Sequence, residues 1–100
     1  MEMVQVDAYA LPADEADAYI ALREECAEAA TKVFQKYCAE VRREWAGSED
    51  GEAITGYDAN GQLQCLIHLD PYDLPIVAAA IQDGTVEKTL CDMNGLAMQK

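Results

Sequence analysis

Basic residues are scarce in this sequence. Seven lysines and arginines stand against nineteen aspartates and glutamates, which gives a formal net charge of −12 over 100 residues. A chain this acidic is repelled by phosphate backbones and by anionic membrane surfaces. The composition therefore argues against direct binding of nucleic acid or of a membrane, and it favours a basic protein as the partner.

The chain also lacks the signals of export. Its first residues, MEMVQVDAYALPADEADAY, contain no basic segment followed by an apolar run, which a secretory signal would need. The longest uncharged run near the C-terminus, residues 74–82, is far shorter than a membrane span. We therefore expect a cytoplasmic protein whose cysteines are reduced and mostly buried.

Motifs of common catalytic and cofactor sites are absent as well. The sequence contains no C-x-x-C, no G-x-G-x-x-G, no P-loop, no G-x-S-x-G and no H-E-x-x-H. The four cysteines lack the spacing of metal ligands; they are Cys26, Cys38, Cys65 and Cys91. We expect neither a cofactor nor a metal ion, and we do not expect an enzyme.

The single histidine, His68, lies in the stretch DANGQLQCLIHLDPYD. Asp70 is two residues further on, so it shares a face with His68 on a strand, and Asp73 follows within one turn. An imidazole oriented by a carboxylate is the arrangement that general-base catalysis requires. A small enzyme that uses His68 and Asp70 is therefore the third functional hypothesis. The adjacent sequence supplies no nucleophile, because Cys65 would point to the opposite face, and Thr55 on the paired strand is the other candidate.

What the sequence does contain is an apolar stripe at helical spacing, formed by Tyr19, Leu22, Cys26, Ala30, Val33, Tyr37, Val41 and Trp45. With no proline or glycine between Pro12 and Gly47, it predicts one helix of about 33 residues that ends at Ala46. Such a helix is longer than a compact domain of this size, so either it bends or breaks, or part of it projects. Its far end, with Tyr37, Val41 and Trp45, would need a cover. A second copy of the chain is the simplest cover, which predicts a homodimer.

Three segments alternate apolar and polar residues, as half-buried strands do: residues 3–9, 53–57 and 63–69. Between the last two, Asp58-Ala59-Asn60-Gly61 matches a type I turn followed by a left-handed glycine, which predicts a hairpin. The same stretch lacks the first and last ligands of a calcium loop. Because residues 63–69 form the most apolar strand, we expect it at the centre, flanked by the first strand and by its hairpin partner.

Two short helices are predicted at the C-terminal end. Asp73-Leu74-Pro75 is typical of a helix start and Gly84 of a helix end, and a second helix runs from Thr85 to Asn94-Gly95. The expected fold is a single compact acidic domain over residues 1–100. It belongs to the α+β class in the order β-α-β-β-α(-α), with a small antiparallel sheet of about three strands packed by one long helix.

Acidic residues gather on one face of the predicted long helix and in the loop that follows it. Carboxylates one helical turn apart lie about 5–6 Å from each other, close to the phosphate spacing of a nucleic-acid strand. A solvated helix surface explains the same acids. The residues expected to contact a partner are Asp14, Asp17, Glu24, Glu25, Glu28, Glu49, Asp50 and Glu52.

The first functional hypothesis is a non-enzymatic interaction protein. In its sharpest form it is a small phage-type inhibitor, such as an anti-CRISPR or anti-restriction protein, that mimics phosphates and blocks a basic nucleic-acid-binding complex. The alternative is a dimeric acidic chaperone or adaptor of the secretion-chaperone type. There, the apolar surface of Tyr37, Val41 and Trp45 would grip a client segment.

Overall fold

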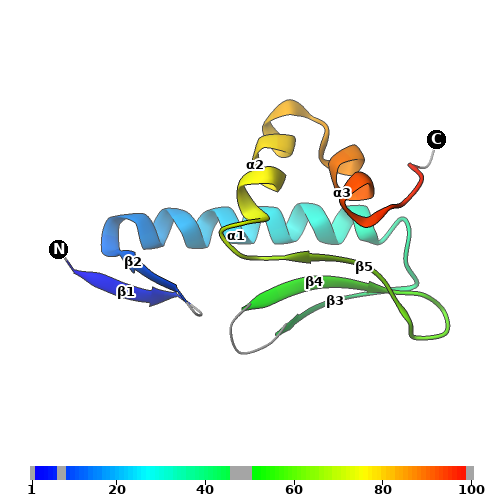
Figure 1. Ribbon diagram of the computed structural model, residues 1–100, viewed down its shortest axis with the longest axis horizontal. Helices are drawn as coiled ribbons and strands as arrows, with labels where there is room; N and C mark the ends of the chain where they lie inside the picture. Colours follow the sequence, from blue (N-terminus) through cyan, green and yellow to red (C-terminus); the bar gives the residue numbers. More distant parts are fainter. Residues whose placement is uncertain (1, 7–8, 46–50, 99–100) are drawn as a thin grey trace.

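The computed structural model describes residues 2–6, 9–45 and 51–98, and it has the predicted α+β class (Figure 1). In chain order the elements are β1 (Met3–Val6), β2 (Tyr9–Pro12), α1 (Ala13–Phe34), β3 (Glu40–Trp45), β4 (Glu52–Tyr57), β5 (Leu63–His68), α2 (Leu74–Asp83) and α3 (Val86–Asn94). A long helix, a three-stranded antiparallel sheet and two short C-terminal helices confirm the predicted class and the approximate order of elements.

The three-stranded sheet has the order β3-β4-β5, so β4 is its central strand. The prediction that residues 63–69 form the central strand is therefore wrong. Among the residues that the structure describes, β1 and β2 pair only with each other, in a separate antiparallel ribbon, and the strand predicted over residues 3–9 spans parts of both. β4, which was expected at an edge of the sheet, pairs on its second side with β3, and the sequence predicts that segment as helix.

α1 ends at Phe34, and the prediction of a single helix to Ala46 is wrong. Val41 and Trp45 lie on β3 instead. A spacing of four residues places two side chains on one face of an α-helix, and it also places them on one face of a strand, where side chains alternate. The stripe was therefore compatible with both structures. Because α1 stops at Phe34, it leaves no projecting apolar helix end for a second copy of the chain to cover, and the homodimer stays a prediction.

Tertiary contacts hold the turn that follows α1. The N–H groups of Lys36 and Tyr37 donate to carbonyl oxygens three residues back, which tightens the last turn of the helix. The Lys36 Nζ and the Tyr37 hydroxyl then both bind the Glu87 carboxylate on α3, at 2.5 Å and 2.8 Å. These contacts with Glu87, which is distant in sequence, hold the end of the helix. No glycine or proline is needed near Phe34 to end it.

α1 is the central element of the fold. In Figure 1 both sheets lie on one side of it and α2 and α3 lie on the other, and α1 contacts both ribbons of strands and both short helices. The core fills the space between these elements. Its largest fully buried side chains include Phe34, Ile54, Ile67, Leu69, Leu74 and Leu90.

The predicted hairpin between β4 and β5 is confirmed. The Asp58 carboxylate accepts hydrogen bonds from the N–H groups of Asn60 and Gln62, at 2.8 Å and 2.9 Å. Gly61 has a φ of 80°, which glycine adopts without strain. Asp58 therefore serves the turn, as its position in the sequence indicated.

The two C-terminal helices also begin and end where the sequence predicts. α2 follows Asp73 and stops at Gly84, and α3 follows Thr85 and stops at Gly95, with both glycines in the left-handed conformation. None of the helices in the described part of the chain is long and apolar enough to cross a membrane.

Candidate functional site

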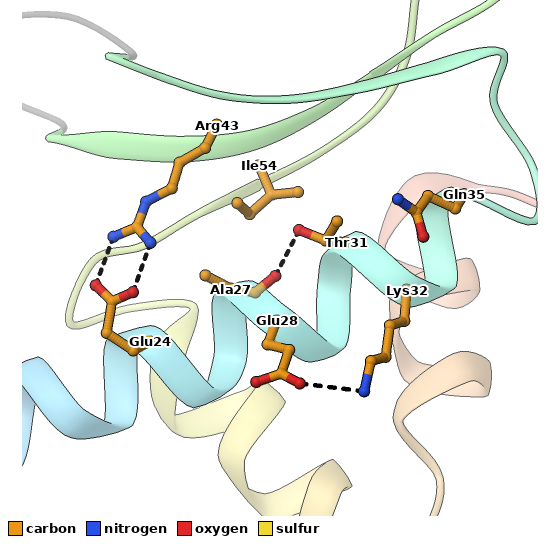
Figure 2. A pocket seen from close by; sticks show the side chains of 8 residues that line it. All are labelled: Glu24, Ala27, Glu28, Thr31, Lys32, Gln35, Arg43 and Ile54. Atoms are coloured by element: carbon orange, nitrogen blue, oxygen red, sulfur yellow. Dashed lines mark hydrogen bonds and ion pairs between the residues drawn. The ribbon is translucent and has the colours of Figure 1, made fainter.

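A groove of about 460 Å³ lies between α1 and the edge strand β3, and we call it the α1/β3 groove (Figure 2). The buried side chains of Ala27 and Ile54 supply apolar surface in it. Polar and charged side chains surround that surface: Glu24, Glu28, Thr31, Lys32, Gln35 and Arg43. An apolar base with charged walls is the surface that suits a long basic side chain.

Arg43 connects the two walls of this groove. Its Nη1 and Nη2 donate to the two carboxylate oxygens of Glu24 on α1, both at 2.7 Å (Figure 2). Its Nε and Nη2 also donate to Glu52 on β4, at 2.8 Å and 3.0 Å. This fork geometry is the strongest form of an arginine–carboxylate pair. The hydrogen bond from Arg43 lowers the pKa of Glu24, so this carboxylate stays ionised while its charge is compensated within the chain.

Five of the predicted acids share one exposed side of α1. At about 100° per residue they fall within roughly 100° of the helix circumference, and we call them the α1 acidic face: Asp14, Asp17, Glu24, Glu25 and Glu28. Glu28 pairs with Lys32 at 3.1 Å, and both side chains are largely exposed. No side chain in the described ranges forms an ion pair with Asp14, Asp17 or Glu25.

The predicted acids of the loop fall elsewhere. Glu52 lies on β4 and binds Arg43, which lines the groove, although Glu52 itself does not line it. Glu49 and Asp50 lie outside the described residues.

The described lysines and arginines all have carboxylate partners inside the chain. Each of the six lies within 4.0 Å of a carboxylate oxygen; they are Arg23, Lys32, Lys36, Arg42, Arg43 and Lys88. Residues 2–6, 9–45 and 51–98 thus present no uncompensated cation to a phosphate, whereas three carboxylates of the α1 acidic face are uncompensated. The surface is built to attract cations.

The three residues predicted as an apolar partner surface do not form one helical stripe. Tyr37 is half-buried in the turn after α1, and Val41 on β3 packs against the core. Trp45 is 56% exposed at the end of β3. Of the three, Trp45 alone presents a large exposed apolar side chain.

The residues of the enzyme hypothesis have other partners. The buried Asp70 carboxylate accepts hydrogen bonds from the N–H groups of Tyr72 and Asp73, at 3.0 Å and 2.8 Å. The Asp73 carboxylate accepts the backbone N–H of His68 at 3.0 Å. Among the described residues neither carboxylate binds the imidazole, and its Nδ1 atom is buried without a hydrogen bond. Both carboxylates instead shape the backbone that leads into α2.

The cysteines predicted to be core residues are mostly buried. Cys26, Cys65 and Cys91 are buried and Cys38 is half-buried, and all four are free thiols. Cys38 lies in the turn after α1 rather than on the helix. In the part of the chain that the structure describes, no group of three or more histidine, cysteine, aspartate or glutamate side chains is placed to hold a metal ion.

Arg43 is the site residue that the sequence analysis did not single out. Within a helix it would be one more solvated cation, whereas on β3 it faces α1 and binds Glu24. The available signal was the strand character of Val41 and Trp45, since β-branched and aromatic residues are enriched in strands.

Comparison of the chain with models of protein families, with curated proteins and with solved structures finds no match in any of the three.

Proposed function

We propose that this protein is a non-enzymatic interaction protein that docks on a basic surface of another protein through the α1 acidic face. The observation that carries the proposal is the distribution of charge. Every described lysine and arginine is paired within the chain, and Asp14, Asp17 and Glu25 project from one exposed helix side without a cation. In its sharpest form, the protein is an inhibitor that occupies the nucleic-acid-binding surface of its partner.

The rigidity of α1 supports this proposal. Cys26, Ala27, Ala30 and Phe34 on its inner side are buried, so packing fixes the direction of the outer side. Carboxylates one turn apart then stand about 5–6 Å from each other. A preformed row of charges loses little conformational entropy on binding, which favours affinity.

The α1/β3 groove gives the partner a specific contact. The aliphatic part of a lysine or arginine side chain can lie against Ala27 and Ile54 while its charged end reaches Glu28. In the described ranges Glu28 forms an ion pair only with exposed Lys32, and such surface pairs contribute at most about 1 kcal/mol. A cation from the partner can therefore replace Lys32 at small cost.

The experiment has two stages. First, the immobilised protein captures partners from a nuclease-treated lysate of its source organism or that organism's host, and mass spectrometry identifies them. The purified partner is then titrated with this protein and with a labelled oligonucleotide, at salt concentrations from about 50 mM to about 500 mM. We expect affinity to fall steeply with salt and the oligonucleotide to be displaced in competition.

A matched pair of variants assigns the surface. Asp14→Asn/Asp17→Asn/Glu25→Gln removes three charges from the α1 acidic face, and we expect at least about a tenfold loss of affinity, or about 1.4 kcal/mol. Glu2→Gln/Asp83→Asn/Asp92→Asn removes three exposed charges elsewhere and serves as the control. Circular dichroism checks that both remain folded.

Three results would contradict the proposal. They are equal effects of the two triple variants, binding that persists at high salt, and the absence of any partner. Salt-insensitive binding would instead favour the adaptor alternative, in which exposed apolar residues such as Trp45 hold a client segment.

A further inference from the structure

Two cysteines that are distant in sequence meet beside the central strand. Cys38 lies in the turn between α1 and β3 and is half-buried, and Cys65 lies on β5 and is buried. Their Sγ atoms are 2.9 Å apart, although 27 positions separate the two residues in the chain. Both are free thiols.

Gly56 of β4 leaves the space that these two sulfur atoms fill. It pairs with Cys65 in the register of β4 and β5. A Cβ atom on Gly56 would lie 2.5 Å from the Cys65 Sγ and would also overlap the Cys38 Sγ. A residue with a side chain would therefore push the thiols out of this position. The two thiols can therefore meet here only because residue 56 is a glycine.

We propose that Cys38 and Cys65 form a reversible disulfide, which makes this pair a redox modification site of the protein. A disulfide joins its sulfur atoms at about 2.05 Å, so these two need to approach each other by less than about 1 Å. The site is separate from the α1 acidic face, and the proposal does not depend on the proposed function.

The oxidant is a small-molecule disulfide of the glutathione type, and the reaction is thiol–disulfide exchange. Burial raises the pKa of the Cys65 thiol to about 12, which makes it a poor first nucleophile. Half-buried Cys38 reacts first: its thiolate forms a mixed disulfide, and one reagent thiol leaves. The sulfur of Cys65 then loses its proton and attacks the Cys38 sulfur, releasing the second reagent thiol. The protein gives up two protons and two electrons, which the reagent disulfide takes up as it becomes two thiols.

This bond would fasten the turn after α1 to β5 across β4. It closes a chain segment that contains β3 and β4, and it limits the conformations of that segment in the unfolded state. For a loop of this size we expect oxidation to raise the melting temperature by roughly 10 °C or more.

The test uses the unmodified protein. The reduced chain is incubated with oxidised glutathione, remaining thiols are alkylated, and proteolytic peptides are analysed by mass spectrometry. We expect a peptide pair linked through Cys38 and Cys65, with the loss of two hydrogens. We also expect a rise in melting temperature that dithiothreitol reverses. In the Cys38→Ser variant the rise should disappear, whereas Cys26→Ala removes a cysteine outside the pair and should keep it.

Several results would overturn the proposal. One is glutathione bound to Cys38 without an internal bond, and another is no oxidation at all. A third is a bond between Cys65 and Cys91, whose thiol lies near enough to contribute to the raised pKa of Cys65. A link between two copies of the chain would overturn it too. Because peptide mapping is done on the native protein, none of these readings depends on the folding of a variant.

Discussion

The aspartates and glutamates of this chain have different roles, and the amino-acid composition does not show which residue has which role. Asp58, Asp70 and Asp73 bind backbone N–H groups and shape two turns. Asp17 and Glu25, by contrast, stand exposed on α1 without a cation among the described residues. The large negative charge therefore combines carboxylates that hold the fold with carboxylates that are available to a partner.

Glu87 is an acid of the first kind, and its titration gives a prediction. Hydrogen bonds from Lys36 and Tyr37 lower the pKa of Glu87 below its ordinary value of 4.5. A carboxyl group with a lowered pKa stabilises the folded state above its unfolded pKa, and that contribution disappears as the pH falls through the folded-state value. We expect Glu87→Gln to reduce the free energy of unfolding at pH 7.

Urea unfolding between about pH 3 and pH 7 measures this effect. The difference between wild type and Glu87→Gln should be largest near neutral pH and should shrink as the pH falls below the ordinary pKa of Glu87. Asp92→Asn, which removes an exposed i,i+4 partner of Lys88 on the same helix, is the control. A difference that stays constant across this range would show that Glu87 acts through packing rather than charge.

At the scale of elements, those with local turn signals at their ends could be predicted from the sequence, whereas β3 could not. Asp58-Ala59-Asn60-Gly61 and the glycines at residues 84 and 95 carry strong local turn chemistry, and the elements that they bound were predicted correctly. The end of α1 has no such signal. It is set by Glu87 and by the pairing of β3 with β4, which are contacts between residues distant in sequence. Tertiary contacts override helix propensity at such a position.

The candidate site follows the same division. The exposed acids of α1 could be predicted, because helical spacing alone places Asp14, Asp17 and Glu25 on one side. The groove beside them could not, since it needs Arg43 on a strand that faces the helix. The contact between Cys38 and Cys65 depends on the same turn, and a helix through residue 38 excluded it.

Arg43 links the edge strand to the helix, and this gives a prediction for the mobility of β3. The described residues of β3 pair with β4 on one side only, and the hydrogen bonds from Arg43 to Glu24 join the strand to α1. We expect Arg43→Gln to speed amide hydrogen exchange in β3 roughly fivefold, equivalent to about 1 kcal/mol for partly exposed ion pairs.

Arg42 provides the matched control for this measurement. It belongs to the same strand but pairs with Glu40 within β3 and lies 4.5 Å over the ring of Tyr57 on β4. Arg42→Gln removes the same charge without cutting the tie to α1. If both variants accelerate exchange equally, the bridge to α1 does not hold the strand.

For the whole molecule, shape and charge act together. The chain extends 48 × 30 × 17 Å, because α1 lies beside two sheets arranged along its length (Figure 1). At about 10 mM salt the screening length is near 30 Å, comparable to the molecule itself. Like charges on all elements then repel one another in the folded state, and unfolding relieves this repulsion.

Salt should therefore stabilise this protein. The excess of carboxylates outweighs the ion pairs, which are mostly exposed and individually weak. We expect the melting temperature to rise between about 10 mM and about 500 mM sodium chloride, where the screening length shortens severalfold. Asp17→Asn/Glu25→Gln, which removes two uncompensated charges, should melt higher than wild type at low salt and gain less from added salt.

Thermal unfolding at several salt concentrations separates the two opposing effects. Screening weakens repulsion and ion pairs alike, so the sign of the change shows which is larger. A melting temperature that falls with salt would mean that the ion pairs of Arg43 and of Glu87 stabilise the fold by more than the repulsion between the excess carboxylates destabilises it. The charges of the α1 acidic face would then be compensated in the folded chain. Pairing these carboxylates with a basic partner would contribute less to the binding free energy.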